Sequence, residues 1–123
     1  MNVITREELK ERLDRGTPFK LIMVLDENAF ARKHIPGSIN IPYGSPALDS
    51  LNPDEELVVY CSGMPCPVSW LAAKRLASRG FRRVGYYAGG LADWEEAGYP
   101  VEGAWATQSA PAKMAGSFQP ATP

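Results

Sequence analysis

A predicted strand, loop and helix in the middle of the sequence place a cysteine where negative charge is stabilised. The apolar, β-branched run Leu57–Tyr60 predicts a short buried parallel strand. Residues 70–79 have the apolar spacing of a helix, with Ser69 as the expected N-cap and Gly80 as the expected stop. The loop between them begins at Cys61. Because backbone N–H groups at a helix start favour anions, we interpret the Cys61 thiol as easily deprotonated and as a candidate nucleophile.

Helix and strand signals alternate over the first hundred residues. A capping box at Thr5–Glu8 starts a helix that is expected to end at Gly16. The other expected elements are strands at 20–25, 38–41 and 83–87, helices at 26–33 and 91–97, and one helical turn near Leu48 and Leu51. This alternation predicts an α/β fold with a central, mostly parallel sheet and helices on both faces. In such sheets functional crevices form at the carboxyl ends of strands, where Cys61 is expected.

Composition and charge narrow the classes of function. A net charge of −1 leaves no basic surplus for nucleic acid or for an anionic membrane surface. No apolar run is long enough to span a bilayer, no signal peptide is evident, and two cysteines are too few for a disulfide scaffold. We therefore expect a cytoplasmic monomer or weak dimer. Residues 1–103 are expected to form one domain, and 104–123, rich in Ala, Pro and Ser, a flexible tail or linker.

Three segments in this order and spacing carry a resemblance to a known family. They are His34-Ile-Pro-Gly-Ser-Ile-Asn-Ile-Pro42, Val58-Val-Tyr-Cys61 followed by Ala72-Ala73, and the closing residues Gly80-Phe81, Val84, Gly89-Gly90, Trp94 and Gly98-Tyr-Pro-Val101. Over residues 3–102 the sequence resembles a rhodanese-like domain, a single-domain sulfurtransferase. The resemblance implies that Cys61 accepts a sulfane sulfur as a persulfide and that a second nucleophile removes it. We expect no cofactor and no metal. It also places the substrate against the loop that follows Cys61, at Ser62, Gly63, Met64, Cys66, Val68 and Ser69.

The sequence departs from the family pattern at two places. Met23-Val-Leu25 stands where the family usually carries Asp-x-Arg. The loop of residues 62–69 contains no Lys or Arg, is about two residues longer than usual, and includes Pro65 and Pro67, which cannot donate hydrogen bonds. Thiosulfate is a dianion and gains most from a cation. We therefore predict that thiosulfate is not the natural donor, and that a persulfide, a polysulfide or the cysteine of a partner protein is.

Several residues have two interpretations. Cys66 is either a resolving thiol that closes a disulfide with Cys61 or a packing residue, and the spacing of the two cysteines is a poor zinc signature. His34 is more consistent with a structural role than with a general base. Gly89-Gly90 is first a turn, with a minor role in shaping access to the site. The arginines at 79, 82 and 83 form either a solvated face or a surface that steers an acidic partner.

Two other functions compete with the sulfurtransferase. One is a dithiol redox protein that cycles a disulfide between Cys61 and Cys66. An oxyanion reductase or phosphatase of related fold belongs to this class, but it would need an arginine to clamp its substrate. The other is a binding module that keeps the fold without catalysis.

Overall fold

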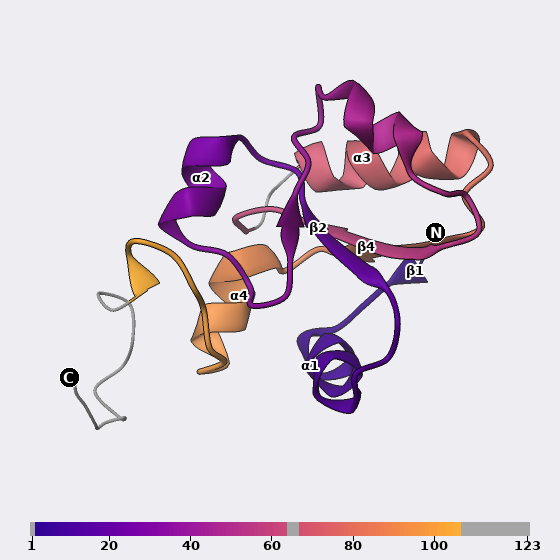
Figure 1. The fold of residues 1–123 in the computed structure, drawn as a ribbon. Helices are drawn as coiled ribbons and strands as arrows, with labels where there is room; N and C mark the ends of the chain where they lie inside the picture. Colours follow the sequence, from indigo (N-terminus) through magenta and orange to yellow (C-terminus); the bar gives the residue numbers. More distant parts are fainter. Residues whose placement is uncertain (1, 64–66, 107–123) are drawn as a thin grey trace.

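The chain folds around a parallel sheet of five strands, seen edge-on in Figure 1. This computed structural model describes residues 2–63 and 67–106. The strands lie in the order β1-β5-β4-β2-β3, and every neighbouring pair is parallel, which confirms the predicted α/β class. The strand bounds are β1 Asn2–Val3, β2 Lys20–Met23, β3 Ile39–Asn40, β4 Glu56–Tyr60 and β5 Arg83–Tyr87. The helices are α1 Arg6–Arg15, α2 Glu27–Arg32, the 3-10 helix η1 Pro46–Ser50, α3 Pro67–Ser78 and α4 Gly90–Glu96.

Strand β4 forms the centre of the domain. It pairs with β5 on one side and with β2 on the other, and Leu57 to Tyr60 are completely buried. Side chains that alternate along β4 enter two separate apolar clusters. One lies between the sheet and the α3 and η1 segments, and the other between the sheet and α1, α2 and α4. Figure 1 shows α3 above the sheet and α1 below it, so helices cover both faces, as the sequence predicts.

The caps at both ends of α1 form as predicted. The Thr5 side chain accepts a hydrogen bond from the Glu8 N–H while the Glu8 carboxylate accepts one from the Thr5 N–H, and this reciprocal contact lowers the pKa of Glu8. Helix α1 then ends at Gly16, which adopts a left-handed conformation. Helix α3 ends in the same way before Gly80, with the Phe81 N–H donating back to the Leu76 carbonyl.

Several predicted strands and helices are one or two residues too long at an end, the starts of α3 and α4 differ, and β1 is missing from the prediction. Helix α3 begins at Pro67 rather than at residue 70, so Ser69 is a buried residue of its first turn and not the N-cap. Proline suits the first helical turn because the missing N–H would have no partner there. The sequence does not predict strand β1, because a strand of two residues has no periodic pattern. This strand forms by pairing with β5. The two glycines at 89 and 90 do not simply precede α4, since the helix begins at Gly90.

The last described residues pack against α2. His34 and Glu102 exchange two backbone hydrogen bonds, and the N–H groups of Ala104 and Trp105 donate to the carbonyls at the end of α2. The Arg32 guanidinium lies 5.2 Å from the centre of the Trp105 ring. Residues 104–106 of the expected tail therefore contact the domain, while 107–123 lie outside the described residues. In the part of the chain that the structure describes, no helix is both long and apolar enough to cross a membrane.

Candidate functional site

Cys61 lies directly after the central strand β4, on the side of the sheet where the carboxyl ends of the parallel strands lie. Its side chain is almost fully buried, with 1% exposed. The sulfur lies 3.6 Å from the hydroxyl oxygen of Ser69 and 4.0 Å from the carbonyl oxygen of Gly63. Ser69 is itself completely buried, in the first turn of α3. The sulfur therefore sits against the start of α3, as predicted, with a hydroxyl beside it.

The structure holds Cys61 in its disulfide-bonded form. The sequence contains one other cysteine, Cys66, which lies outside the described residues together with Met64 and Pro65. The predicted roles of Met64 and Cys66 therefore stay predictions. Among the other predicted loop residues, Ser62 is exposed, and Gly63 and Val68 are half-buried.

The first turn of α4 holds the start of the loop. The Leu91 N–H donates to the Cys61 carbonyl at 2.9 Å, and the Ala92 N–H donates to the Ser62 carbonyl at 2.8 Å. Gly90 has a positive φ of 64° and brings its backbone against the Cys61 carbonyl and the backbone of Gly63. The tandem glycines thus have a larger role than the turn that the sequence predicted, since they let α4 fasten the loop that carries Cys61.

Tyr60, the residue before Cys61, is completely buried and connects β4 to the segment of residues 34–42. The Ile35 N–H donates to the phenol oxygen at 3.0 Å, and the Ser38 hydroxyl lies 2.8 Å from it. Because the Ser38 hydroxyl donates to the Ile35 carbonyl, the Tyr60 O–H is the donor toward Ser38. Burial raises the pKa of Tyr60 to about 12, although both hydrogen bonds oppose the shift. Sequence reasoning missed this contact.

His34 makes structural contacts, as predicted. Its Nδ1 lies 2.7 Å from the Phe30 carbonyl oxygen, and its ring stacks on the Phe30 ring with centroids 3.9 Å apart. The segment that replaces Asp-x-Arg is also fastened through its backbone. The Asn40 side-chain amide donates to the carbonyls of Met23 and Leu25 at 3.1 and 2.9 Å. A polar contact thus supports this strand end, although the family's charged pair is missing.

The arginines on and after α3 are divided between two acidic partners, Asp49 and Asp54. Arg75 is ion-paired with Asp49, and the hydrogen bond to this carboxylate is the main reason that the pKa of Arg75 is raised. Arg79 shares the same carboxylate at 3.4 Å. Arg82 and Arg83 instead contact Asp54, through its side chain and its backbone carbonyl respectively. The predicted cluster at 79, 82 and 83 is therefore anchored to two different acidic residues.

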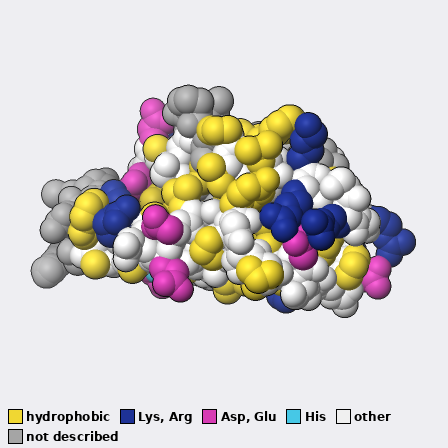
Figure 2. Space-filling view, turned by 90° about the horizontal axis from the view of Figure 1, so that it is seen from above, with side chains coloured by type: hydrophobic (Ala, Val, Ile, Leu, Met, Phe, Trp, Pro, Cys, Tyr) yellow, Lys and Arg dark blue, Asp and Glu magenta, His cyan; other side chains and the backbone are white. Residues whose placement is uncertain are grey.

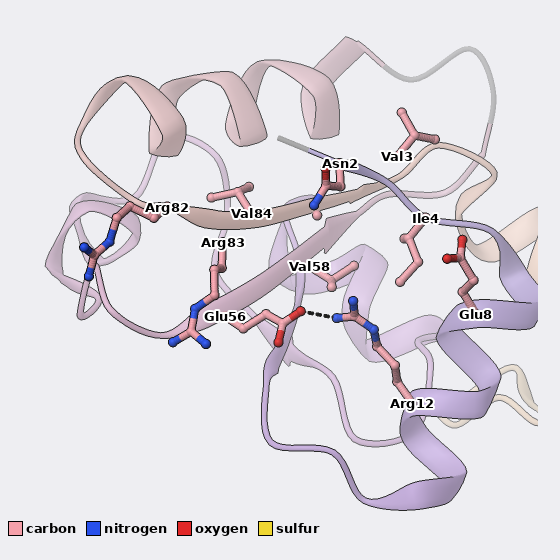
Figure 3. Close-up of a pocket in the computed structure, with 11 residues that line it drawn as sticks. Asn2, Val3, Ile4, Glu8, Arg12, Glu56, Val58, Arg82, Arg83 and Val84 are labelled. Atoms are coloured by element: carbon pink, nitrogen blue, oxygen red, sulfur yellow. Dashed lines mark hydrogen bonds and ion pairs between the residues drawn. The ribbon is translucent and has the colours of Figure 1, made fainter.

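A cavity of about 440 Å³ lies at the amino-terminal ends of β4 and β5, whereas Cys61 follows the carboxyl end of β4 (Figure 3). In Figure 3 the Arg12–Glu56 ion pair is drawn as a dashed line at this cavity, with Val58 above it in the view. Its lining residues are Asn2, Val3, Ile4, Glu8, Arg12, Glu56, Val58, Arg82, Arg83, Val84 and Gly85. Since this cavity lies at the amino-terminal ends of the strands, it is not part of the candidate site. Within residues 2–63 and 67–106, no group of His, Cys, Asp and Glu side chains could hold a metal ion.

Comparison with known protein families decides the relationship of this chain. The profile described as "Rhodanese-like domain" matches residues 5–97, which is more than half of the 123 residues. The chain belongs to the rhodanese-like domain family. The matched span runs from the cap of α1 to the end of α4 and contains Cys61 and the loop after it.

Two curated relatives of this rhodanese-like protein are longer than it is. The HTH-type transcriptional regulator Rv0324 of Mycobacterium tuberculosis is 38% identical over 103 residues, which cover 82% of this chain and 45% of the relative. "Putative sulfur carrier protein YrkF" of Bacillus subtilis is 29% identical over 94 residues, which cover 74% of this chain and 49% of the relative. The chain spans about half the length of these curated relatives.

Solved rhodanese-like structures share the fold. BH2092 from Bacillus halodurans superposes with a TM-score of 0.79 at 27% identity, covering 87% of this chain and 80% of that one. Thiosulfate sulfurtransferase from Pseudomonas aeruginosa superposes with a TM-score of 0.74 at 26% identity, covering 84% of this chain and 20% of that one. The relatives thus connect the chain to the sulfurtransferase family, and its own substrates are a separate question.

Proposed function

We propose that this rhodanese-like protein is a sulfurtransferase or persulfide carrier that takes sulfane sulfur onto Cys61 and passes it to a thiophilic acceptor. The observation that carries the proposal is the position of the Cys61 sulfur, which lies at the carboxyl end of β4 against the first turn of α3. That turn favours negative charge, and the Ser69 hydroxyl can donate to a thiolate. The names of the sulfur carrier and sulfurtransferase relatives support the same chemistry.

The proposed reaction has two balanced steps. In its reduced form the Cys61 thiolate attacks the outer sulfur of a persulfide or polysulfide, the donor's S–S bond breaks, and the donor leaves as a thiolate or shorter polysulfide. An acceptor thiolate then attacks the outer sulfur of the Cys61 persulfide, and Cys61 leaves as a thiolate. No oxidant, metal or cofactor is consumed in either step.

Thiosulfate is a poor substrate in this proposal. Residues 62–69 contain no Lys or Arg to attract a dianion. Arg75 on α3 and Arg79 just after it are already ion-paired with the carboxylate of Asp49. The preferred donors are therefore a persulfide, a polysulfide or a partner protein's cysteine persulfide.

A dithiol redox function is the second candidate, and the disulfide-bonded state of Cys61 favours it. In this alternative an external disulfide is reduced to its dithiol by thiol–disulfide exchange while Cys61 and Cys66 form a disulfide, and an external dithiol later reverses the exchange. The disulfide also blocks sulfur loading, so the carrier reaction requires reduced protein.

One experiment separates the candidates. Reduced protein is treated with polysulfide, its intact mass is recorded, and the measurement is repeated with Cys61→Ser and Cys66→Ser. A gain of one sulfur that requires Cys61 and survives Cys66→Ser supports the carrier. A loss of two hydrogens that requires both cysteines, without sulfur gain, supports the redox protein. No change in mass rejects both and leaves a non-catalytic binding module.

A further inference from the structure

The face of α3 beside the candidate site exposes two large apolar side chains. Trp70 and Leu71 are 40% and 39% exposed, and they directly follow Ser69, whose hydroxyl contacts the Cys61 sulfur. The opposite side of the same helix is buried in the core through Ala72, Ala73 and Leu76. Figure 2 looks down on the α3 side of the molecule and shows hydrophobic side chains gathered across its middle, next to a group of Lys and Arg. A group of exposed apolar side chains beside a group of cations is a candidate interaction surface.

This surface carries excess positive charge. The Lys74 ammonium lies 4.6 Å from the centre of the Trp70 ring and makes no ion pair within the described residues. Arg75 and Arg79 share the single carboxylate of Asp49. Lys74, Arg75 and Arg79 thus carry three positive charges against the one negative charge of Asp49, although the whole chain has a net charge of −1. We call Trp70, Leu71 and Lys74 the α3 outer face.

Charge identifies the kind of molecule that fits this face. Residues 107–123 contain one Lys and no Asp or Glu, so the chain's own C-terminal segment does not complement it. A second copy docked with two-fold symmetry would bring the same positive face against itself. A partner with carboxylates around an apolar side chain matches both the charge and the exposed Trp70 and Leu71.

We propose that the α3 outer face docks an acceptor protein whose reactive cysteine is flanked by an apolar side chain and by Asp or Glu residues. This rests on the proposed function, because the docked thiol is the one that removes sulfur from Cys61. Lys74 is five residues beyond Ser69, which is about 7.5 Å farther along the helix. That distance is within one Debye length of about 8 Å, so a carboxylate near Lys74 can guide a thiol toward Cys61.

The test uses two synthetic peptides as acceptors, each with one cysteine and one leucine, and with either four glutamates or four lysines. Cys61 is first loaded with polysulfide, excess donor is removed, and loading is checked by intact mass. The rate of sulfur arrival on each peptide is then followed by mass spectrometry. We expect the acidic peptide to react about tenfold faster at low salt, with the advantage lost at high salt. Lys74→Glu should remove the preference, and Trp70→Ala should slow the acidic peptide several-fold.

Lys10→Glu is the matched control, because it makes the same change of net charge on α1, which covers the other face of the sheet. Equal rates for the two peptides, or equal effects of Lys10→Glu and Lys74→Glu, would overturn the docking proposal while leaving sulfur loading intact. Failure of Cys61 to load would instead reject the proposed function. In that case anisotropy of a labelled acidic peptide, with serine in place of its cysteine, tests docking alone. Binding that Lys74→Glu does not weaken rejects it.

Discussion

A Cβ atom added to Gly90 would lie 2.5 Å from the carbonyl oxygen of Cys61. It would also lie 2.8 Å from the Gly63 nitrogen, and both neighbours are backbone atoms of the loop that follows β4. Neither can rotate away as a flexible side chain would. The close approach therefore makes position 90 a sensitive test of whether α4 shapes the candidate site.

We predict that Gly90→Ala destabilises the protein by more than about 2 kcal/mol and lowers the rate of sulfur loading on Cys61. The substitution adds the clash to the cost of about 1–2 kcal/mol for a non-glycine residue at positive φ. Gly98→Ala is the matched control, because its φ is 82° and its Cβ would meet nothing within 4 Å. Urea unfolding and mass-detected loading measure both variants. If Gly98→Ala slows loading as much as Gly90→Ala, the effect is not local to the loop.

We predict that Ser69→Ala slows alkylation of reduced Cys61 by iodoacetamide at neutral pH by about fivefold. The Ser69 hydroxyl lies 3.6 Å from the sulfur, and both groups are buried. Removing a donor worth about 1 kcal/mol leaves less of Cys61 as the reactive thiolate. Ser78→Ala is the control, because Ser78 is an exposed α3 residue whose hydroxyl bonds to the Arg75 carbonyl. Equal alkylation rates in wild type and Ser69→Ala would show that the hydroxyl does not stabilise the thiolate.

The phenol of Tyr60 predicts a loss of stability at alkaline pH. Its pKa is about 12 in the folded protein and about 10 in an unfolded chain, so folding favours the neutral form. That contribution is complete below about pH 10 and disappears as the pH rises toward 12. Tyr60→Phe should cost about 1–3 kcal/mol at about pH 8, because the Ile35 N–H loses its acceptor.

The difference in unfolding free energy between wild type and Tyr60→Phe should therefore shrink above about pH 10. The pKa of Tyr87 is also raised, by burial and by its hydrogen bond to Asp93, but Tyr87 titrates in both proteins and cancels from the comparison. Urea unfolding of both proteins at several alkaline pH values measures the difference. A difference that stays constant up to about pH 11 would contradict the assignment.

The parts of this fold that the sequence predicts depend on neighbouring residues. The bounds of β5 match the predicted 83–87, and the reciprocal cap of α1 forms between Thr5 and Glu8. Both features depend on side chains within a few positions of each other. Cys61 could be located for the same reason, because its strand and its helix adjoin it in the chain.

The parts that the sequence does not predict depend on distant residues. The N–H of Leu91 meets the carbonyl of Cys61 across thirty positions, and no local pattern at either residue reveals it. Tyr60 looks like an ordinary strand residue in the sequence. Its hydroxyl accepts a hydrogen bond from the Ile35 N–H only because the fold brings residues 25 positions apart together. The start of α3 is predicted wrongly because serine is a typical N-cap. In the folded protein Ser69 is instead buried against Cys61, which its sequence neighbours do not reveal.

The absence of a cation in residues 62–69 predicts how the donor preference can be changed. Ser62 is exposed and directly follows Cys61, and its carbonyl rather than its side chain holds it to Ala92. We predict that Ser62→Arg lowers the KM for thiosulfate about tenfold in a thiosulfate:cyanide assay, because a charge-assisted contact of about 1.4 kcal/mol forms with the dianion. Ser62→Gln, which adds length without charge, should leave the KM near the wild-type value. Efficient use of thiosulfate by the wild-type protein, or equal KM values for the Arg and Gln variants, would show that the missing cation does not set the donor preference.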